Sequence, residues 1–277
     1  KVEDLKSQGK LPKIAMFGGS VFLFPHPVKE LAEFLKGHGM HINYDAAHVA
    51  GLIAGGKFQD PLREGTDTMT MSTHKTLFGP QGGLVLGSEE HAEPIKKAMF
   101  PGLTSSHHIH HMGAKAVAFA EALEFGKDYA EQTIKNAKML ASELNNVGFK
   151  VLGEKRGYTE SHQTVVNVLD YGDGGTIEAD LEKANIIVNR QLIPGDLKAG
   201  RHYMHPGGIR LGTSEITRLG MKESEMKEIA SLLKQVVVDK KDAGEIAVHV
   251  KEFKTDFKKT QYCFDNKLGA YEYVKLR

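Results

Sequence analysis

The 277-residue chain has little of several features that define other protein classes. It has one cysteine, Cys263, no tryptophan and a formal net charge of only +1. One cysteine excludes an internal disulfide and a cysteine-based zinc site, and it fits a reducing compartment, so we expect a cytoplasmic location. The small net charge, without any block of Lys or Arg, argues against a nucleic-acid partner. No apolar run approaches membrane-spanning length and no signal-like segment is evident, so we expect no membrane partner.

What is present is ordinary globular composition, with 40% apolar and 26% charged residues, enough for one large domain or two modest ones. Apolar stretches predict strands at 13–17, 40–44, 66–72 and 83–87, and helical spacing predicts a helix at 28–36. Strands that alternate with helices indicate a mostly parallel sheet with helices on both faces. The predicted fold class is therefore α/β.

The second half predicts a different organisation. Two helices are expected at 110–125 and 128–147, and Gly126-Lys127 between them is the predicted domain boundary. We therefore expect one domain over 1–126 and a smaller α+β domain over 127–277. The strands expected in the smaller domain lie at 150–152, 164–169, 186–189 and 208–211, and its helices at 177–184 and 223–239. Residues 250–277 form either a tail or a last helical element.

Lys75 and Asp45 are the strongest candidates for chemistry. Asp45 ends one predicted strand, and Lys75 lies in a turn of small residues between two others. Ser20 also follows a strand, and ligands of such sheets collect at the carboxyl ends of strands. Enzymes that use pyridoxal phosphate (PLP) need a lysine amine for its aldehyde and a carboxylate for its ring nitrogen. Taken singly, an Asp in such a position is more commonly a loop cap, and a Lys is more commonly a surface residue.

Two further groups of residues are candidates for binding. Arg210 lies on a short strand flanked by glycines, where it can hold a carboxylate through two hydrogen bonds or form a structural ion pair. The histidines 107, 108, 110 and 111 have helical metal-ligand spacing, but no carboxylate or cysteine is nearby to complete a set. We therefore expect no metal and assign the histidines to packing or anion contact.

Several stretches together resemble the serine hydroxymethyltransferase family, which are PLP enzymes of fold type I with a mostly parallel, seven-stranded large domain. The matching stretches are 18–20, 45–52, 73–77, 79–83, 100–102, 208–213 and 216–218, in the order and spacing of the family from about 13 to about 240. The resemblance makes 1–126 part of the PLP-binding large domain and 127–277 the small domain. The sequences Asp-Ala-Ala-His-Val-Ala-Gly-Leu at 45–52 and Thr-His-Lys-Thr-Leu at 73–77 are the most specific.

The resemblance implies a role for each matching residue. Lys75 would form the internal aldimine with PLP, and Asp45 would pair with the ring nitrogen. Further contacts with the cofactor are implied for Ser20, Ala47, His48, His74 and Gly102. Arg210 would hold the carboxylate of serine or glycine. The implied reaction of one-carbon metabolism is the reversible transfer of the serine hydroxymethyl carbon to a reduced pterin by a homodimer whose subunits share active sites.

Three departures from the family pattern bear on the substrate. The loop at 103–108 replaces a Gly-rich segment and resembles an archaeal branch, and Gln81 stands where many members have Arg. Gln191 stands where members that use folate place an Asn that contacts the pterin. The carrier implied is therefore either tetrahydrofolate or tetrahydromethanopterin.

The beginning of the chain also departs from the family. Residue 1 is Lys, and 3–9 is typical of the end of a helix, so the chain opens inside an α/β pattern. We expect an N-terminal portion of the family to be missing, including a proposed acid/base Glu, and we expect these residues alone to fold without catalysing the reaction. Two rival interpretations stay open: a PLP aldolase of β-hydroxy amino acids that needs no pterin, and an inactive fragment.

Overall fold

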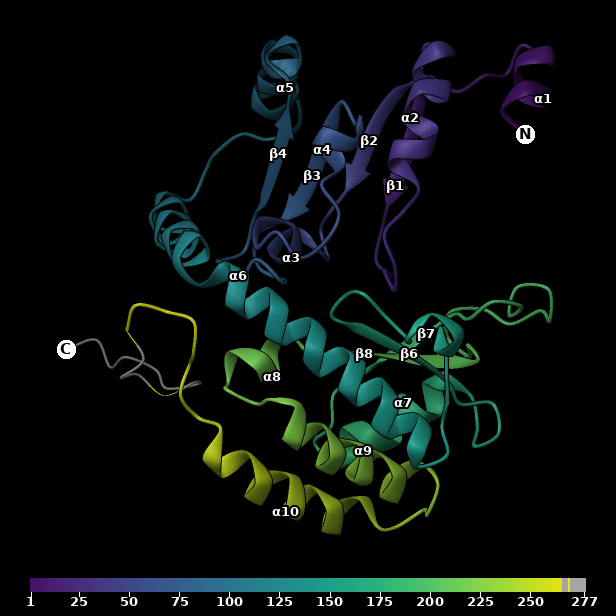
Figure 1. The fold of residues 1–277 in the computed structure, drawn as a ribbon, viewed down its shortest axis with the longest axis vertical. Helices are drawn as coiled ribbons and strands as arrows, with labels where there is room; N and C mark the ends of the chain where they lie inside the picture. Colours follow the sequence, from purple (N-terminus) through teal and green to yellow (C-terminus); the bar gives the residue numbers. More distant parts are fainter. Residues whose placement is uncertain (266–268, 270–277) are drawn as a thin grey trace. The chain divides into compact units, whose positions relative to one another are not determined.

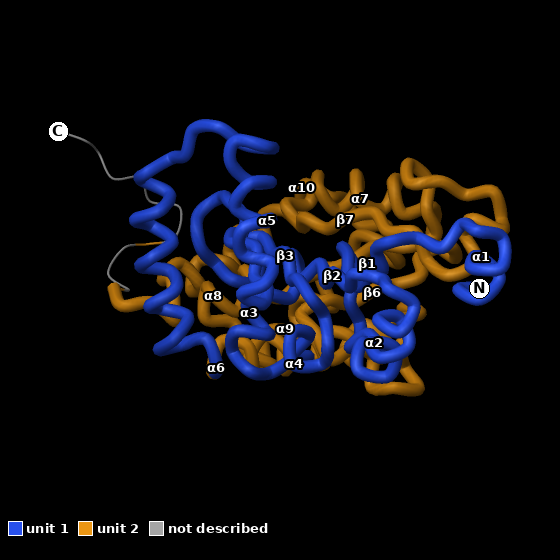
Figure 2. Tube along the Cα trace, turned by 90° about the horizontal axis from the view of Figure 1, so that it is seen from above, with its two compact units in different colours: residues 1–127 blue, residues 128–277 orange. Residues whose placement is uncertain are grey.

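The computed structural model describes residues 1–265 and 269 and divides into two compact units, Lys1–Lys127 and Asp128–Arg277 (Figure 2). This division lies one residue beyond the boundary that Gly126-Lys127 suggested. Within residues 1–265 and 269, none of the helices combines the length and the apolar character needed to span a membrane.

The first unit is built on a four-stranded sheet in the order β1-β2-β3-β4 (Figure 1). Its strands are β1 (Ile14–Gly18), β2 (His41–Asp45), β3 (Thr68–Ser72) and β4 (Gly83–Gly87). The first three strands are parallel, and β4 runs antiparallel to β3. Gly18 pairs with Asp45, and Asp45 with Thr70, so the carboxyl ends of β1, β2 and β3 meet at one edge. All four strands were predicted to within two residues.

Short helices surround this sheet. They are α1 (Val2–Ser7), α2 (Val28–Gly37), α3 (Ala50–Ala54), α4 (Pro61–Glu64) and α5 (Ala92–Lys97), with a 3-10 turn, η1 (Glu89–His91), and a π-helical turn, η2 (Ala98–Leu103). Helix α2 forms because Val28, Ala32 and Leu35 share one side of it and are buried. Ala32 and Leu35 pack in one cluster with Met40 and Ile42 of the sheet region, and this packing fixes α2 on one face of β1 and β2.

Helix α6 (Ile109–Asn146) corrects one prediction. It is a single helix of 38 residues and runs through Gly126-Lys127, where a break between two helices was expected. A glycine inside a helix costs only about 1 kcal/mol, so it does not end a helix by itself. Gly126 is buried, and a Cβ there would lie 4.0 Å from the Cα of Gly55. This is ordinary van der Waals contact, so Gly126 lies beside the end of α3 without being forced to be glycine.

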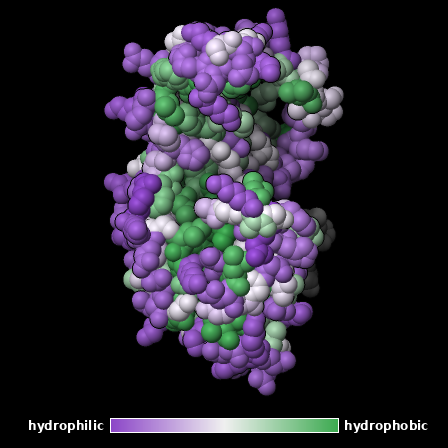
Figure 3. Space-filling model, turned by 90° about the vertical axis from the view of Figure 1, so that its right-hand side faces the viewer, coloured by the Kyte–Doolittle hydropathy of each residue, from purple (hydrophilic) through white to green (hydrophobic). Residues whose placement is uncertain are grey.

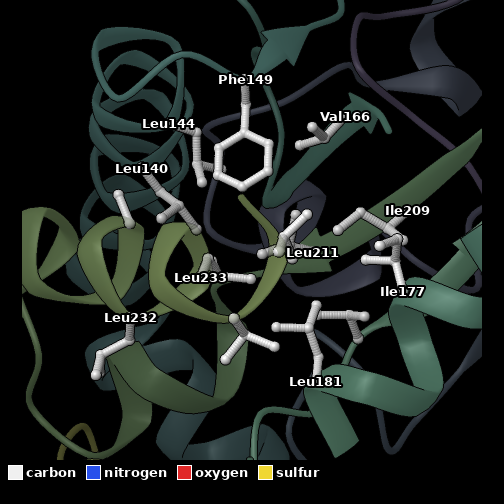
Figure 4. Packing of buried hydrophobic residues seen from close by; sticks show 14 of the residues in the cluster. Leu140, Leu144, Phe149, Val166, Ile177, Leu181, Ile209, Leu211, Leu232 and Leu233 are labelled. Atoms are coloured by element: carbon white, nitrogen blue, oxygen red, sulfur yellow. The ribbon is translucent and has the colours of Figure 1, made fainter. Parts of the chain in front are cut away.

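The second unit has an antiparallel sheet in the order β5-β6-β8-β7. Its strands are β5 (Lys150–Val151), β6 (Gln163–Asn167), β7 (Asn189–Gln191) and β8 (Gly208–Gly212). Its helices are α7 (Gly174–Lys183), α8 (Ser214–Arg218), α9 (Glu223–Val237) and α10 (Ala243–Phe253), with 3-10 turns η3 (Glu154–Arg156) and η4 (Lys254–Asp256). A core of leucine, isoleucine, valine and phenylalanine side chains joins the sheet to α6, α7 and α9 (Figure 4).

Two element bounds in this unit differ from the sequence prediction. The strand expected at 186–189 lies at Asn189–Gln191. Ile187 is exposed and Val188 is buried, which is the alternation typical of a strand. Pairing with β8 begins only at Asn189, so the strand begins there. Helix α7 begins before its expected start because the Asp173 side chain accepts hydrogen bonds from the amides of Gly175 and Thr176.

Two remaining features concern the chain end and the surface. The stretch expected at 250–277 continues α10 to Phe253, and 266–268 and 270–277 lie outside the described residues. Hydrophilic residues dominate the face shown in Figure 3, with hydrophobic residues exposed between them. Ile14 and Met16 of the edge strand β1 are among the exposed hydrophobic residues of the first unit, at 59% and 66%.

Candidate functional site

The three predicted site positions of the first unit emerge at the same sheet edge. Asp45 is the last residue of β2, Ser20 follows the end of β1 by two residues, and Lys75 follows the end of β3 by three. Because these strands are parallel and in the register given above, the three turns are neighbours. Asp45 and Lys75 are half-buried, and Ser20 is exposed.

The turn that carries Lys75 is held by its own backbone. The amide of Thr73 donates to the carbonyl of Gly82 (3.0 Å), and the amide of Gly79 donates to the carbonyl of Thr73 (2.6 Å). The Thr73 hydroxyl also donates to the carbonyl of Pro80 (2.7 Å), and Thr73 is fully buried. These bonds close the loop on both sides of Lys75. The backbone of Lys75 is thus fixed before any ligand binds, which lowers the entropy cost of using its amine.

A second set of contacts fastens this turn to the turn after Asp45. The amide of Gly51 in α3 donates to Thr76 Oγ1 (3.0 Å), and the Thr76 hydroxyl donates to the carbonyl of His48 (3.0 Å). A Cβ on Gly51 would lie only 2.0 Å from the Thr76 carbonyl oxygen, so only glycine permits this approach. Thr76, the residue next to Lys75, therefore links the Lys75 turn with the segment that begins at Asp45 and includes His48.

Asp45 is held by backbone contacts with Ala47 and Gly18. Its Oδ1 accepts a hydrogen bond from the Ala47 amide (2.9 Å). A Cβ on Gly18 would lie 2.2 Å from the Asp45 carbonyl oxygen, and Gly18 has a φ of +89°, so this position requires glycine. The Gly18 amide donates to Nδ1 of His26 (3.1 Å). The loop that carries Ser20 is thus fixed against Asp45.

The remaining predicted residues of this unit are distributed as follows. Ala47 and His48 are half-buried in the turn after β2, and His74 is exposed next to Lys75. Gly102 is exposed in η2, which packs against α5. The first unit thus brings all but Gly102 of its predicted cofactor residues to one sheet edge.

Arg210 and Gln191 belong to the second unit. Arg210 lies on β8 opposite Asn189 of β7, and its Nη2 donates to Asn189 Oδ1 (3.1 Å). Burial lowers the pKa of the Arg210 guanidinium, while Tyr203 acts in the opposite direction. Gln191 lies two residues further along β7, on the same face as Asn189, and its Nε2 donates to the Leu192 carbonyl (2.9 Å). Arg210 remains cationic and can bind an anion.

The histidine cluster stands at the start of α6. The ring centroids of His108, His110 and His111 are 4.4–5.5 Å apart. In the part of the chain that the structure describes, no group of three His, Cys, Asp or Glu side chains is arranged to hold a metal ion.

The sequence matches one family over most of its length. The profile described as serine hydroxymethyltransferase matches residues 2–233. The chain belongs to the serine hydroxymethyltransferase family. It is 76% identical to a serine hydroxymethyltransferase of Nitrosopumilus maritimus and 75% identical to one of Cenarchaeum symbiosum, in both cases over all 277 residues. The chain spans 63% of the length of each of these relatives.

A solved structure is also similar. It is the L-threonine transaldolase of Pseudomonas fluorescens in the internal aldimine state, with a TM-score of 0.85 and 32% identity over 96% of this chain and 60% of that one. The predicted family, its archaeal branch and the α/β fold of type I PLP-dependent transferases are therefore confirmed. PLP is the cofactor that both the family and this neighbour support.

Sequence reasoning missed several residues that position the serine hydroxymethyltransferase motifs. Thr76, which directly follows Lys75, and Gly51 were taken only as parts of matching stretches. Asn189 was not identified as a partner of Arg210, although its cross-strand position follows once β7 and β8 are paired. His26 gave no sequence signal, because its contact with Gly18 depends on the fold of the loop between β1 and α2.

Proposed function

We propose that the protein to which these residues belong is a PLP-dependent enzyme that transfers the hydroxymethyl group of serine reversibly to a reduced pterin and leaves glycine. The observation that carries the proposal is the sheet edge where the turns of Asp45 and Lys75 are fastened together through Thr76 and Gly51. Family membership supplies the reaction class. We further propose that the protein acts as a homodimer in the cytoplasm.

The residues at this edge fit PLP. A lysine amine and a carboxylate, both half-buried, are the two groups that this cofactor needs, and they stand on turns of neighbouring strands. Gly19 leaves open space beside Ser20, since a Cβ there would meet no atom within 4 Å. We propose that Lys75 and Asp45 hold PLP together with Ser20, Ala47, His48 and His74, and that Gly102, which lies away from this edge, contributes to the PLP site of the second subunit.

The bound cofactor supplies an electron sink for the α-carbon of the amino acid. The protein supplies the placement and the protons. The Asp45 carboxylate would keep a proton on the ring nitrogen, because opposite charges in contact at a dry site favour ionisation. The Lys75 amine would hold the aldehyde, and His48 and Ser20, on the turns after β2 and β1, would donate hydrogen bonds to the cofactor. Because both turns are fixed by the backbone, Asp45 and Lys75 keep one separation throughout the reaction.

Arg210 is the proposed group for the substrate carboxylate. A guanidinium can hold a carboxylate through two parallel N–H donors, and Nη2 of Arg210 also donates to Asn189 Oδ1. Burial of Arg210 strengthens such a contact, since less water competes for the charge. Gln191, on the same face, is the proposed contact to the pterin.

The pterin itself is either tetrahydrofolate or tetrahydromethanopterin, and we propose the latter. Gln191 is one methylene longer than the Asn of folate-using members, and its amide folds back onto the Leu192 carbonyl. The relatives of highest similarity described above are archaeal, which fits the archaeal loop at 103–108. Turnover should be faster with tetrahydromethanopterin at matched concentrations, and equal or reversed rates would contradict this choice.

A second function is favoured by one observation. The similar solved structure is named a threonine transaldolase, an enzyme of β-hydroxy amino acids. An aldolase would cleave serine or threonine without a pterin. Glycine formation from serine is therefore measured with and without each reduced pterin. A rate that does not depend on the pterin would replace the transferase by the aldolase.

The cofactor assignment is tested by borohydride reduction with PLP, followed by peptide mapping of the full-length protein. The label should fall on Lys75, should vanish in Lys75→Arg and should persist in Lys57→Arg, a matched variant of another half-buried lysine in the same unit. A label on another lysine would contradict the proposal. The same reaction and a serine assay on residues 1–277 alone test the prediction that this part folds but does not turn over serine.

A further inference from the structure

The loop that joins β1 to α2 spans residues 19–27 and carries Ser20 (Figure 1). We call it the Ser20 loop. It begins beside Asp45, because Gly18 pairs with Asp45 in the sheet and the Gly19 amide donates to the Asp45 carbonyl (3.3 Å). It then leads from the carboxyl end of β1 to the first residue of α2. The position of Ser20 at the candidate site therefore depends on how this loop is closed.

The side chain of His26 closes the loop. The Gly18 amide donates to Nδ1 of His26 (3.1 Å), a residue eight positions later in the chain, so the imidazole joins the two ends of the Ser20 loop. The ring stacks on Phe22, with ring centroids 5.0 Å apart, and it meets the Tyr44 ring edge-on at 6.3 Å. Phe22 is 1% exposed and Tyr44 is fully buried. The imidazole is thus held between its own loop and β2.

The backbone of His26 is held by one buried side chain, that of Gln59. Gln59 Oε1 accepts from the His26 amide (3.0 Å), and its Nε2 donates to the His26 carbonyl (2.6 Å). The same Oε1 accepts from the Tyr44 hydroxyl (2.9 Å), and the same Nε2 donates to Glu64. Both lone pairs and both N–H groups of the amide are therefore used. Loss of any of these bonds would leave a buried polar group without its partner, so Gln59 holds His26 in one position.

The hydrogen bond at Nδ1 requires one protonation state of His26. A backbone amide can only donate, so Nδ1 must offer its lone pair to Gly18, and the proton of the neutral ring lies on Nε2. A protonated ring carries a hydrogen on both nitrogens. Nδ1 would then face the Gly18 amide as a second donor, so proton uptake by His26 breaks the bond that closes the Ser20 loop.

The surroundings of the ring favour the neutral form. Burial lowers the pKa of His26 below its usual 6.5, and the Ser20 loop contains no other ionisable side chain. The ionisable residues of the adjoining end of β2, of α4 and of the segment before α4 are Tyr44, Asp45, Lys57, Asp60, Arg63 and Glu64. Burial raises the pKa of Tyr44, so its hydroxyl stays a donor to Gln59. Arg63 is exposed and pairs with Asp60, and Glu64 is bound to Gln59.

We propose that His26, held by Gln59, is a positioning residue for the PLP site: it fixes the Ser20 loop against Asp45 while its ring is neutral and releases the loop when the ring takes up a proton. The inference deepens the proposed function and rests on it, because it takes Ser20 as a contact of PLP. The affinity for PLP is then linked to the proton on His26. Loss of the one hydrogen bond should weaken PLP binding about tenfold.

Two substitutions separate the acceptor of the ring from its titration. His26→Asn places Oδ1 where Nδ1 lies and does not titrate, whereas His26→Leu has similar bulk without an acceptor. The PLP dissociation constant of the full-length protein is measured by absorbance. At neutral and higher pH, His26→Asn should bind PLP as the original protein does, and His26→Leu should bind it about tenfold more weakly.

The pH profile tests the link to the proton. As the pH falls from about 8 to about 5, the original protein should lose more affinity for PLP than His26→Asn, by a factor that approaches about ten. Other titrating groups are common to both proteins, so the ratio of their dissociation constants isolates His26. The matched control is His38→Asn, a change of another half-buried histidine of the first unit, which should follow the original protein at every pH.

Hydrogen exchange of peptides that cover 18–27 supplies a readout that needs no PLP. At one pH, exchange in the PLP-free protein should be faster in His26→Leu than in the original protein and unchanged in His26→Asn. Unchanged exchange and PLP binding in His26→Leu would reject His26 as a positioning residue, and an equal loss of affinity on acidification in the original protein and His26→Asn would reject the link to the proton. A protein whose exchange follows these expectations but which takes up no PLP would support the closure of the loop by His26 and contradict the proposed function.

Discussion

Replacing Gly51 by alanine should damage the candidate site without touching any residue that binds a ligand. Gly51 lies inside α3, and an added Cβ would lie 2.0 Å from the Thr76 carbonyl oxygen and 2.3 Å from its carbon. Both are backbone atoms, so no side chain can rotate away. The only relief is a shift of α3 away from the turn that carries Lys75, which stretches the hydrogen bond from the Gly51 amide to Thr76 Oγ1.

The free-energy change caused by Gly51→Ala has three contributions. Overpacking of a buried contact costs about 1–3 kcal/mol. Loss of the hydrogen bond adds about 0.5–1.5 kcal/mol. Alanine in place of glycine within a helix returns about 0.5–1 kcal/mol. With the middle of each range, the net loss is about 2 kcal/mol, equal to a ~30-fold larger opening equilibrium for the Lys75 turn.

Hydrogen exchange of peptides that cover residues 70–83 measures this opening directly. The matched control is Gly37→Ala at the end of α2, where a Cβ would meet nothing within 4 Å, and its effect should be neutral or slightly stabilising. Reductive labelling of Lys75 with PLP should weaken in Gly51→Ala and stay unchanged in Gly37→Ala. If Gly51→Ala leaves both exchange and labelling as in the original chain, the contact between α3 and the Lys75 turn does not position the site.

Two further predictions concern Arg210 and His26. Arg210→Ala in the full-length protein should weaken the binding of serine and glycine by about 2–5 kcal/mol without loss of PLP, because a paired charge contact is removed. Titration calorimetry measures this, and unchanged affinity would assign the carboxylate to another group. Burial lowers the pKa of His26 below its usual 6.5, so the unfolded chain takes up the proton first. The stability from neutral His26 is thus full above pH 6.5 and falls as the pH drops below it, until the pH passes the folded pKa. The urea midpoint of the first unit should therefore decrease less between pH 7.5 and 5.5 in His26→Gln, and an equal decrease would contradict this account.

The positions of Asp45 and Lys75 at one sheet edge could be predicted because they depend on local signals. A short apolar run specifies each strand, and the small residues after it specify the turn. Parallel pairing then brings the ends of neighbouring strands together without further information. The shift of β7 to Asn189–Gln191 could not be predicted, because the alternation of Ile187 and Val188 looks like a strand whether or not a partner is present.

The roles of glycines are the features that the sequence predicts least well. Gly126 looked like a helix break, yet it is buried in an unbroken helix beside Gly55. Gly18 and Gly51 belong to matching stretches, but only the fold shows that each lies against a backbone carbonyl, of Asp45 and of Thr76. In each case the information lies in a second segment distant in sequence, which no local pattern contains.

This use of glycine has a consequence for how the site is built. Main-chain contacts at Gly18 and Gly51, together with the Thr76 hydroxyl, set the separation of the Asp45 and Lys75 turns, and main-chain atoms cannot adjust by changing rotamer. Substitutions of exposed neighbours such as His74 leave those contacts intact, whereas any side chain at Gly18 or Gly51 forces whole segments to move. The geometry that a PLP site requires is therefore encoded as much by residues without side chains as by the lysine and the carboxylate that carry the chemistry.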